Sequence, residues 1–266
     1  MITIQKYVRA QSLEEAYQLN QNTRNRVIGG MLWVKMGNGS VNTAIDLCDL
    51  GLNRIEETET EFSIGASVTL RQIEMHEGLN AYACGAVKKA VKDIVGVQFR
   101  NMATVGGSLW GRFGFSDVLT VFMGMDAQVE LFRGGVVPLE QFAQMKPDND
   151  ILVRLIVKKT PGRIVYTAMR AQRTDLPLLT CCATDIGGAA RVIVGARPGR
   201  AMVVRDAEGL LAQGITPQSA AAFALYAAEH VPTGSNSRAG AAYRSRLVRV
   251  LVERSMNEMG GAEGWK

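Results

Sequence analysis

Histidine and cysteine, two residue types that commonly bind metals in proteins, are scarce in this sequence. The 266 residues include two histidines and four cysteines, which are Cys48, Cys84, Cys181 and Cys182. No two cysteines have the two-residue gap of common iron–sulfur and zinc sites, and a chain of this length does not need disulfide bonds for stability. We therefore expect no metal site and four reduced, structural cysteines.

Long hydrophobic runs are also missing. Residues 118–125 form one of the longest apolar stretches, far shorter than the roughly 20 residues that a membrane-spanning helix needs. The first residues lack the long apolar core of a signal peptide. These absences predict a cytoplasmic protein that does not enter a membrane.

Charge is unevenly distributed along the chain. The formal net charge is +5, but acidic residues slightly outnumber basic ones in residues 1–150, and basic residues predominate in 151–266. This asymmetry favours separate domains, the second with an acidic neighbour. The arginines are scattered and no aromatic platform accompanies them, so we do not expect a nucleic-acid partner.

Two glycine pairs stand out against this background. Gly29-Gly30 lies between apolar segments, and Gly106-Gly107 is flanked by the hydroxyls of Thr104 and Ser108. Main chain without Cβ atoms can lie directly against a ligand, and free N–H groups beside hydroxyls form a concave site for a pyrophosphate. We infer that the two glycine corners hold one dinucleotide between them. Two ordinary tight turns are the alternative.

The periodicity predicts three structural regions. Residues 1–51 contain strands at 2–4, 25–28 and 43–47 and a helix from Leu13, a βαβ-like unit in which the first glycine pair ends a strand. That pair lacks the G-x-G-x-x-G spacing, which disfavours a Rossmann site.

The second region, 52–157, is an α+β unit. Its expected elements are a hairpin within 53–65, three helices, and strands at 127–132 and 151–157. The first helix begins after Thr69, and the other two span 81–95 and 117–124. Ser116 is the expected N-cap of the helix at 117–124.

The third region contains four short strands between 163 and 204, which predict one antiparallel sheet, and then helices at 217–229 and 239–259. The arginines of the last helix, at positions 244, 246, 249 and 254, are expected to form a solvated face, with a partner interface as the alternative. We place a domain boundary near 157–162.

Several of these segments resemble one known family. Thr104-Val105-Gly106-Gly107-Ser108, followed by Phe115-Ser116-Asp117 and then residues 125–131, is similar to the signature of the FAD-binding medium subunit of molybdenum hydroxylases. That family includes xanthine dehydrogenase and carbon monoxide dehydrogenase. Residues 64–70, 97–101 and 241–254 fit the same family, so the resemblance extends over essentially the whole chain in one order.

The resemblance implies an α+β fold of the vanillyl-alcohol-oxidase type. Two α/β subdomains, about 1–51 and 52–157, would form an FAD-binding domain at 1–157. A C-terminal domain at 163–266 would consist of a small antiparallel sheet with helices.

The resemblance also implies that both glycine corners touch the FAD pyrophosphate, and that Ser116 and Asp117 lie near the ribityl and adenosine portions. No catalytic side chain is expected, because the isoalloxazine carries the chemistry. The implied cofactor-binding residues are Ile28, Gly29, Gly30, Met31, Leu32, Thr104, Val105, Gly106, Gly107, Ser108, Ser116 and Asp117.

The implied function is electron transfer within a multi-subunit molybdenum hydroxylase similar to xanthine dehydrogenase. In this family, electrons pass from a large molybdopterin subunit through the [2Fe–2S] clusters of a small subunit to FAD, and then to NAD or another acceptor. A free-standing flavin reductase and a cofactor-less binding or assembly protein of the same fold are the alternatives. The substrate of the complex lies outside what this sequence encodes.

The sequence departs from the family pattern at three places. The first glycine loop is one residue shorter than the usual Gly-Gly-Thr-Asp-Leu and lacks its threonine, Ser108 replaces an asparagine, and Met169 stands where a lysine is common. The cysteine loop that binds an additional cluster in some members is missing.

Overall fold

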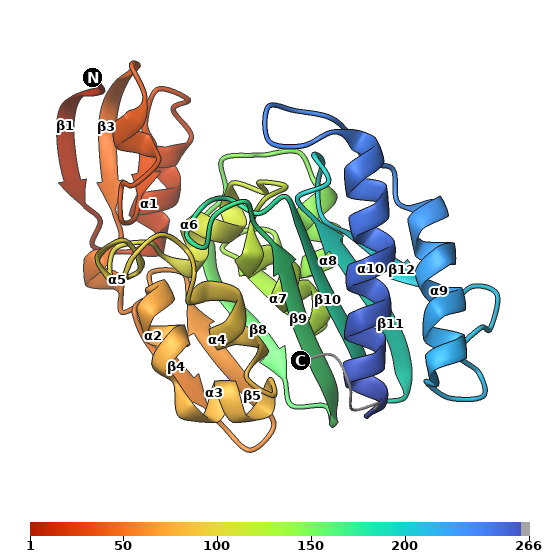
Figure 1. Ribbon diagram of the computed structural model, residues 1–266. Helices are drawn as coiled ribbons and strands as arrows, with labels where there is room; N and C mark the ends of the chain where they lie inside the picture. The colour runs from red at the N-terminus through yellow and green to blue at the C-terminus, as the bar shows by residue number, and fades with distance from the viewer. Residues whose placement is uncertain (262–266) are drawn as a thin grey trace.

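The computed structural model describes residues 1–261, which form three sheets with helices packed around and between them (Figure 1). The last five residues of the predicted C-terminal domain lie outside this range. The expected boundaries between domains stay predictions; the chain crosses from one sheet to the next between β8, Leu152–Lys158, and β9, Gly162–Met169.

The N-terminal sheet is small and parallel, as the βαβ pattern predicts. Its strand order is β1-β3-β2, and both outer strands run parallel to β3. Ala16 on the helix packs against Ile45 on the central strand in a small core. The elements are β1 Thr3–Arg9, α1 Leu13–Asn20, β2 Arg26–Ile28, η1 Val34–Met36, β3 Ser40–Asp46 and η2 Cys48–Leu50. β2 therefore ends directly before Gly29.

The second sheet has five strands in the order β4-β5-β8-β6-β7, all paired antiparallel. The predicted hairpin and both later strands are confirmed, and β7 with the helix after it is additional. The strands besides β8 are β4 Ile55–Glu57, β5 Glu61–Gly65, β6 Gln128–Leu131 and β7 Gly135–Pro138.

Short helices cover one face of this sheet. They are α2 Leu70–Met75, α3 Glu77–Tyr82, α4 Ala86–Val91, α5 Val97–Arg100, α6 Val105–Trp110, α7 Asp117–Gly124 and α8 Leu139–Gln144. The helix predicted after Thr69 is α2, which begins with a capping box of Thr69 and Gln72, and Ser116 caps α7 as predicted. The single helix predicted at 81–95 is wrong, because Cys84 and Gly85 take φ values of 51° and 76° and separate α3 from α4. Left-handed backbone cannot continue a right-handed helix.

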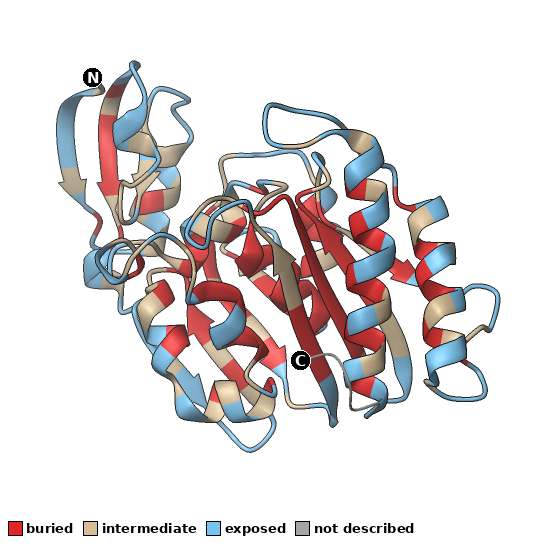
Figure 2. Ribbon diagram, viewed as in Figure 1, coloured by how far each residue is buried: buried red, intermediate tan, exposed pale blue. Residues whose placement is uncertain are grey.

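The C-terminal sheet is antiparallel in the order β12-β11-β10-β9, as predicted. Besides β9, its strands are β10 Leu179–Ile186, β11 Ala189–Gly195 and β12 Met202–Arg205. One face contacts α4 and α7, and the other lies under α9, Pro217–His230, and α10, Ala241–Gly260. A buried layer runs through both faces (Figure 2). The fold is therefore layered as sheet, helices, sheet, helices.

Cys181 and Cys182 show how the two sides of this sheet are built. Cys182 belongs to the core shared with the central helices, and Cys181 to the core under α9 and α10, so the neighbours point to opposite faces as predicted. Burial raises the pKa of Cys181 to about 12, and it also raises the pKa of Cys182. Both remain neutral thiols that fill the core.

The predicted solvated arginine face of the last helix is wrong at one position. Arg246, Arg249 and Arg254 are exposed, but Arg244 is only 1% exposed. Its guanidinium donates to the carbonyls of Leu178, Gly234 and Ala239 and to Asn236. Hydrogen bonds to carbonyl oxygens of the loop before α10 thus stabilise this buried cation. The spacing of residues along the helix alone does not predict such contacts.

Within residues 1–261, no helix combines the length and the apolar character that would let it cross a membrane.

Candidate functional site

A large pocket of about 1040 Å³ lies where the three parts of the chain meet. Ile28 from the N-terminal sheet, Thr104 at the start of α6 and Arg170 directly after β9 all line it. Its volume is at the upper end of the roughly 300–1,000 Å³ of ligand pockets. All predicted cofactor-binding residues line this pocket except Val105, whose side chain is buried in the core.

The two glycine corners are in direct contact at this pocket. A Cβ on Gly30 would lie 1.8 Å from the carbonyl oxygen of Met102, and a Cβ on Gly29 would lie 2.9 Å from Thr104 Oγ1. Neither glycine has a positive φ. Glycine is therefore required here by close approach of two backbone segments and not by left-handed geometry.

The first corner presents unpaired donors. Within residues 1–261, no oxygen accepts a hydrogen bond from the N–H groups of Gly29, Gly30, Met31 and Leu32. Met31 has a φ of 61°, a conformation that few residues with a side chain adopt. Successive N–H groups around a left-handed residue form a concave nest that binds anions. Of the two corners, this one has the backbone donors that an anion site needs.

The second corner differs from its prediction. Gly106 and Gly107 lie in the first turn of α6, where Thr104 is the N-cap and accepts from Gly107 N at 3.1 Å. The other early N–H groups, of Val105, Gly106 and Ser108, donate to the carbonyls of Val68, Ala66 and Thr104. The free N–H groups expected here are thus already paired, and Ser108 Oγ donates to Thr104 O. What this corner offers the pocket is bare backbone at Gly107 and the hydroxyl hydrogen of Thr104.

Ser116 and Asp117 line the pocket but mainly hold protein groups together. Ser116 Oγ donates to Ser108 O and accepts from Leu119 N, which joins α6 to α7. Asp117 is buried and accepts from the hydroxyl of Tyr166 and, at 2.6 Å, from Arg170 Nη2. Burial raises the pKa of Asp117, and the Arg170 charge counteracts that effect. The pair places a guanidinium on the pocket wall.

The pocket's aromatic residues and Arg170 were not among the predicted site residues. Trp33, Phe113 and Phe115 line the pocket with ring centroids 5.2–6.2 Å apart. The signal was present, because Trp33 follows the first glycine corner and Gly-Arg-Phe-Gly-Phe precedes Ser116. Arg170 carried no such signal, since only the tertiary fold brings it to Asp117.

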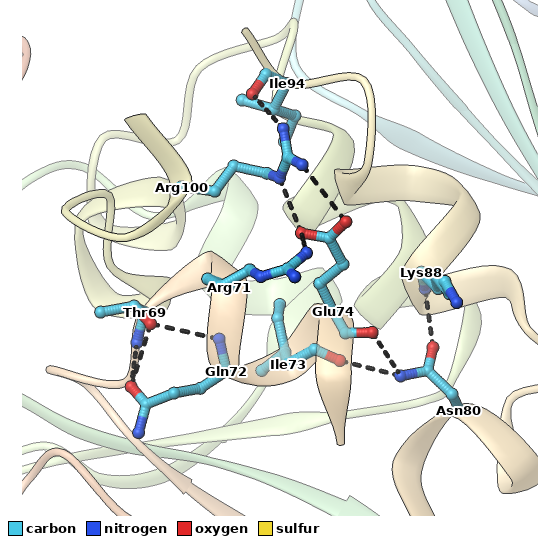
Figure 3. A network of polar contacts seen from close by, with 9 residues as sticks. All are labelled: Thr69, Arg71, Gln72, Ile73, Glu74, Asn80, Lys88, Ile94 and Arg100. Carbon is cyan, nitrogen blue, oxygen red and sulfur yellow. Dashed lines mark hydrogen bonds and ion pairs between the residues drawn. The ribbon is translucent and has the colours of Figure 1, made fainter. Parts of the chain in front are cut away.

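A buried ion pair holds another part of the pocket wall in place (Figure 3). Glu74 on α2 accepts from Arg100 Nε at 2.7 Å and from Nη2 at 3.2 Å, and Arg71 Nη1 lies 3.1 Å from the same carboxylate. Arg100 also donates to the carbonyl of Ile94. Ile94 lines the pocket, so this network fixes the loop between α4 and α5.

Burial of Glu74 opposes its charge, but hydrogen bonds from Arg100 and Arg71 outweigh that effect and lower its pKa. The carboxylate is therefore ionised at neutral pH. Arg100 in the family-like segment 97–101 therefore has a structural role, and its neighbour Phe99 lines the pocket.

These residues fit a dinucleotide. The nest of N–H groups and the Thr104 hydroxyl suit a diphosphate, and the pocket is mostly apolar elsewhere, with aromatic rings for flat ring systems. The two glycine corners meet where a Cβ would strike backbone, so the cradle exists before any ligand binds. The fold and the site thus define a dinucleotide-binding protein of mixed helix and sheet structure.

The family follows from comparison with known proteins. Residues 2–160 match the family described as "FAD binding domain in molybdopterin dehydrogenase". The chain belongs to this family, and its cofactor is FAD. The resemblance seen in the sequence is therefore confirmed.

Solved structures share the whole fold. The chain is 19% identical to a chain of the reconstituted CO dehydrogenase from Oligotropha carboxidovorans, with a TM-score of 0.86 over 98% of this chain and 99% of that one. For quinoline 2-oxidoreductase from Pseudomonas putida 86 the values are 20% identity, a TM-score of 0.82 and 96% of each chain. These matches confirm the predicted fold class.

A curated relative is YgfM of Escherichia coli K12, which carries the description "uncharacterized protein". It is 23% identical over 255 residues, which is 94% of each chain. The similarity extends through the C-terminal sheet and helices, beyond the residues that the family pattern covers.

Proposed function

We propose that this chain is the FAD-carrying electron-transfer subunit of a molybdenum hydroxylase complex, similar to xanthine dehydrogenase. The chain would receive electrons from the [2Fe–2S] clusters of a small partner subunit, fed by a large molybdopterin subunit, and would pass them to NAD or another acceptor. The single observation that carries this proposal is the preformed cradle, in which Gly29 and Gly30 pack against Thr104 and Met102 and the N–H groups of residues 29–32 have no partner within residues 1–261.

In this proposal Gly29, Gly30, Met31 and Leu32 hold the diphosphate through their N–H groups, and Thr104 donates its hydroxyl hydrogen to it. Gly107 leaves room for the ligand to approach the backbone of α6. When bound, FAD supplies the redox chemistry, including the exchange between one-electron and two-electron carriers. Side chains position and shield the cofactor, and none is assigned as a general acid or base.

The shortened first loop is compatible with this role. A threonine hydroxyl is missing there, but the left-handed Met31 turns its neighbours' N–H groups into a nest. Thr104 brings a hydroxyl to Gly29 from the second corner. Backbone donors thus take the place of the missing side chain.

The test begins with the purified chain and its visible absorption spectrum. One flavin per chain, released as FAD on denaturation, is the expected result. Co-expression with the neighbouring open reading frames should yield a complex that contains iron and molybdenum, and substrate-derived electrons should bleach the flavin. A flavoprotein without such partners would point to a free-standing reductase. A protein that stays colourless alone and in the complex would contradict the proposal.

A further inference from the structure

One side of the pocket is bounded by two loops from different parts of the chain. Residues 92–96 connect α4 to α5, and residues 170–176 follow β9. We call the second segment the strap. Val95 lines the pocket from the first loop, and Leu176 lines it from the strap. Contacts between the two loops therefore hold this side of the pocket together.

An exposed ion pair joins the two loops. Arg173 Nε donates to Asp93 Oδ1 at 2.9 Å, and the two side chains are 80% and 23% exposed. Each partner directly precedes a residue that lines the pocket, Thr174 in the strap and Ile94 in the other loop. Exposed pairs of this kind are weak and are screened by salt. The pair is therefore a contact that can open and close.

The strap is held firmly at its first residue. The guanidinium of Arg170 donates to buried Asp117 and to the carbonyl of Asp175, both at 2.6 Å. Arg238 forms a further ion pair with the carboxylate of Asp175, at 2.6 Å. These contacts fix where the strap begins and where it returns, and they leave its middle to the pair with Asp93.

The middle of the strap has few other contacts. Residues 171–174 are exposed, and among the residues that the structure describes no hydrogen bond joins their backbone to another element. The N–H of Asp175 donates to the carbonyl of Gln172, which closes a turn within the strap. Exposed segments with few hydrogen bonds open at a low cost in free energy. The strap is therefore the mobile member of the two loops.

The loop at 92–96 is the fixed member. Arg100, itself held by the buried network described above, donates to the carbonyl of Ile94 at 3.2 Å. Val95 has a φ of 50°, which a β-branched residue adopts only where the surrounding structure enforces it. The carboxylate of Asp93 is thus presented by a loop that is already ordered.

We propose that the strap is hinged at Arg170 and latched by the Arg173–Asp93 pair, and that opening of this latch sets the rate at which the bound ligand leaves the pocket. This inference rests on the proposed function, under which the ligand is FAD. Because an exposed pair contributes little free energy, its loss should speed release by about two- to fivefold and should leave the fold intact.

The experiment measures FAD release from the flavin-loaded protein after dilution, with free and bound flavin separated by rapid ultrafiltration. Arg173→Gln and Asp93→Asn should each release FAD about two- to fivefold faster than wild type. The exchanged pair, Arg173→Asp with Asp93→Arg, should return the rate toward the wild-type value. Arg205→Gln is the matched control, because it removes an exposed pair with Glu140 and neither of these residues lines the pocket. Its release rate should be unchanged.

The two single variants also separate a latch from a simple effect of charge on an anionic ligand. Loss of a positive charge near the diphosphate would weaken FAD binding, and loss of a negative charge would strengthen it. A latch instead predicts faster release in both Arg173→Gln and Asp93→Asn. Opposite effects of the two substitutions, or no effect of either, would overturn the inference.

Salt provides a second measurement. Release from wild type should accelerate more between low and high salt than release from Arg173→Gln, because the variant has no ion pair left to screen. Equal salt responses would contradict the latch and leave the proposed function standing. Wild-type protein that binds no FAD would instead refute the proposed function.

Discussion

The α-carbon of Gly30 packs against the carbonyl group of Met102, so closely that a Cβ would lie 1.8 Å from the carbonyl oxygen. These residues are far apart in the sequence, and their contact joins the two glycine corners into one cradle. The contact involves backbone on both sides, so no side-chain rotation can relieve the steric clash that a larger residue at position 30 would cause. The geometry of the pocket therefore depends on the absence of a single methyl group.

Gly30→Ala should separate the two corners. We expect the unfolding free energy to fall by about 1–3 kcal/mol, as for an overpacked site, and FAD content to fall with it. Urea unfolding and the ratio of flavin to protein absorbance measure the two effects. Gly39→Ala is the matched control, because Gly39 lines the same pocket and a Cβ there meets nothing within 4 Å. Equal losses in both variants would show that the contact with Met102 is unimportant.

Substitutions at the two glycines of α6 should have different effects, one on the stability of the fold and the other on FAD binding. A Cβ on Gly106 would lie 2.6 Å from Ala66 O, so Gly106→Ala should lower the unfolding free energy. Gly107 is exposed at the pocket and its Cβ would approach only Thr104 Oγ1, at 3.1 Å. Gly107→Val should therefore stay folded but weaken FAD binding at least about tenfold, or 1.4 kcal/mol. Thermal unfolding and titration of flavin-free protein test this, and unchanged FAD affinity in Gly107→Val would mean that the ligand does not approach α6.

Asp117 and Arg170 should behave as a coupled pair. Removing one partner of a buried pair leaves an uncompensated charge, so Asp117→Asn and Arg170→Met should each cost about 3–5 kcal/mol. The double variant should cost less than the two single costs combined. Urea unfolding of all four proteins gives the coupling energy.

The exposed pair of Arg205 and Glu140 is the control for that cycle, since its partners are 57% and 41% exposed. Its coupling energy should not exceed about 1 kcal/mol. If the Asp117–Arg170 pair gave a similarly small value, burial would not be the source of its strength.

The network around Glu74 predicts a loss of stability in acid. The pKa of Glu74 is lower in the folded protein than its ordinary value of 4.5. Its contribution is therefore present above the ordinary pKa and is lost as the pH falls through the lowered one. The unfolding free energy of the wild type should fall more steeply below about pH 4.5 than that of Glu74→Gln.

At neutral pH, Glu74→Gln should itself be less stable, because Arg100 then stays buried without its charge partner. Urea unfolding across a pH series measures both effects. Parallel pH profiles for the two proteins would show that the carboxylate does not carry this dependence.

Local structure was largely predictable from the sequence. The N-caps at Thr69, Ser116 and Thr216 are short-range signals, in which a hydroxyl accepts from a backbone N–H three residues later, and each begins a helix as expected. Short strands separated by turns over residues 163–204 predicted the antiparallel sheet, which the structure contains. The helix at 81–95 failed because a helical apolar repeat does not show the left-handed turn at Cys84 and Gly85.

The sequence by itself determined the family, the order of the elements and almost all of the pocket-lining residues proposed to bind FAD, because these depend on local patterns and linked motifs. Only the tertiary structure decided how the site works. It gave the first N–H groups of α6 partners within the protein, left those of residues 29–32 without a partner among residues 1–261, and placed Arg170 beside the buried Asp117. The physical reason is that hydrogen-bond partners and close backbone contacts between distant segments depend on how whole layers pack, and no short stretch of sequence encodes that packing.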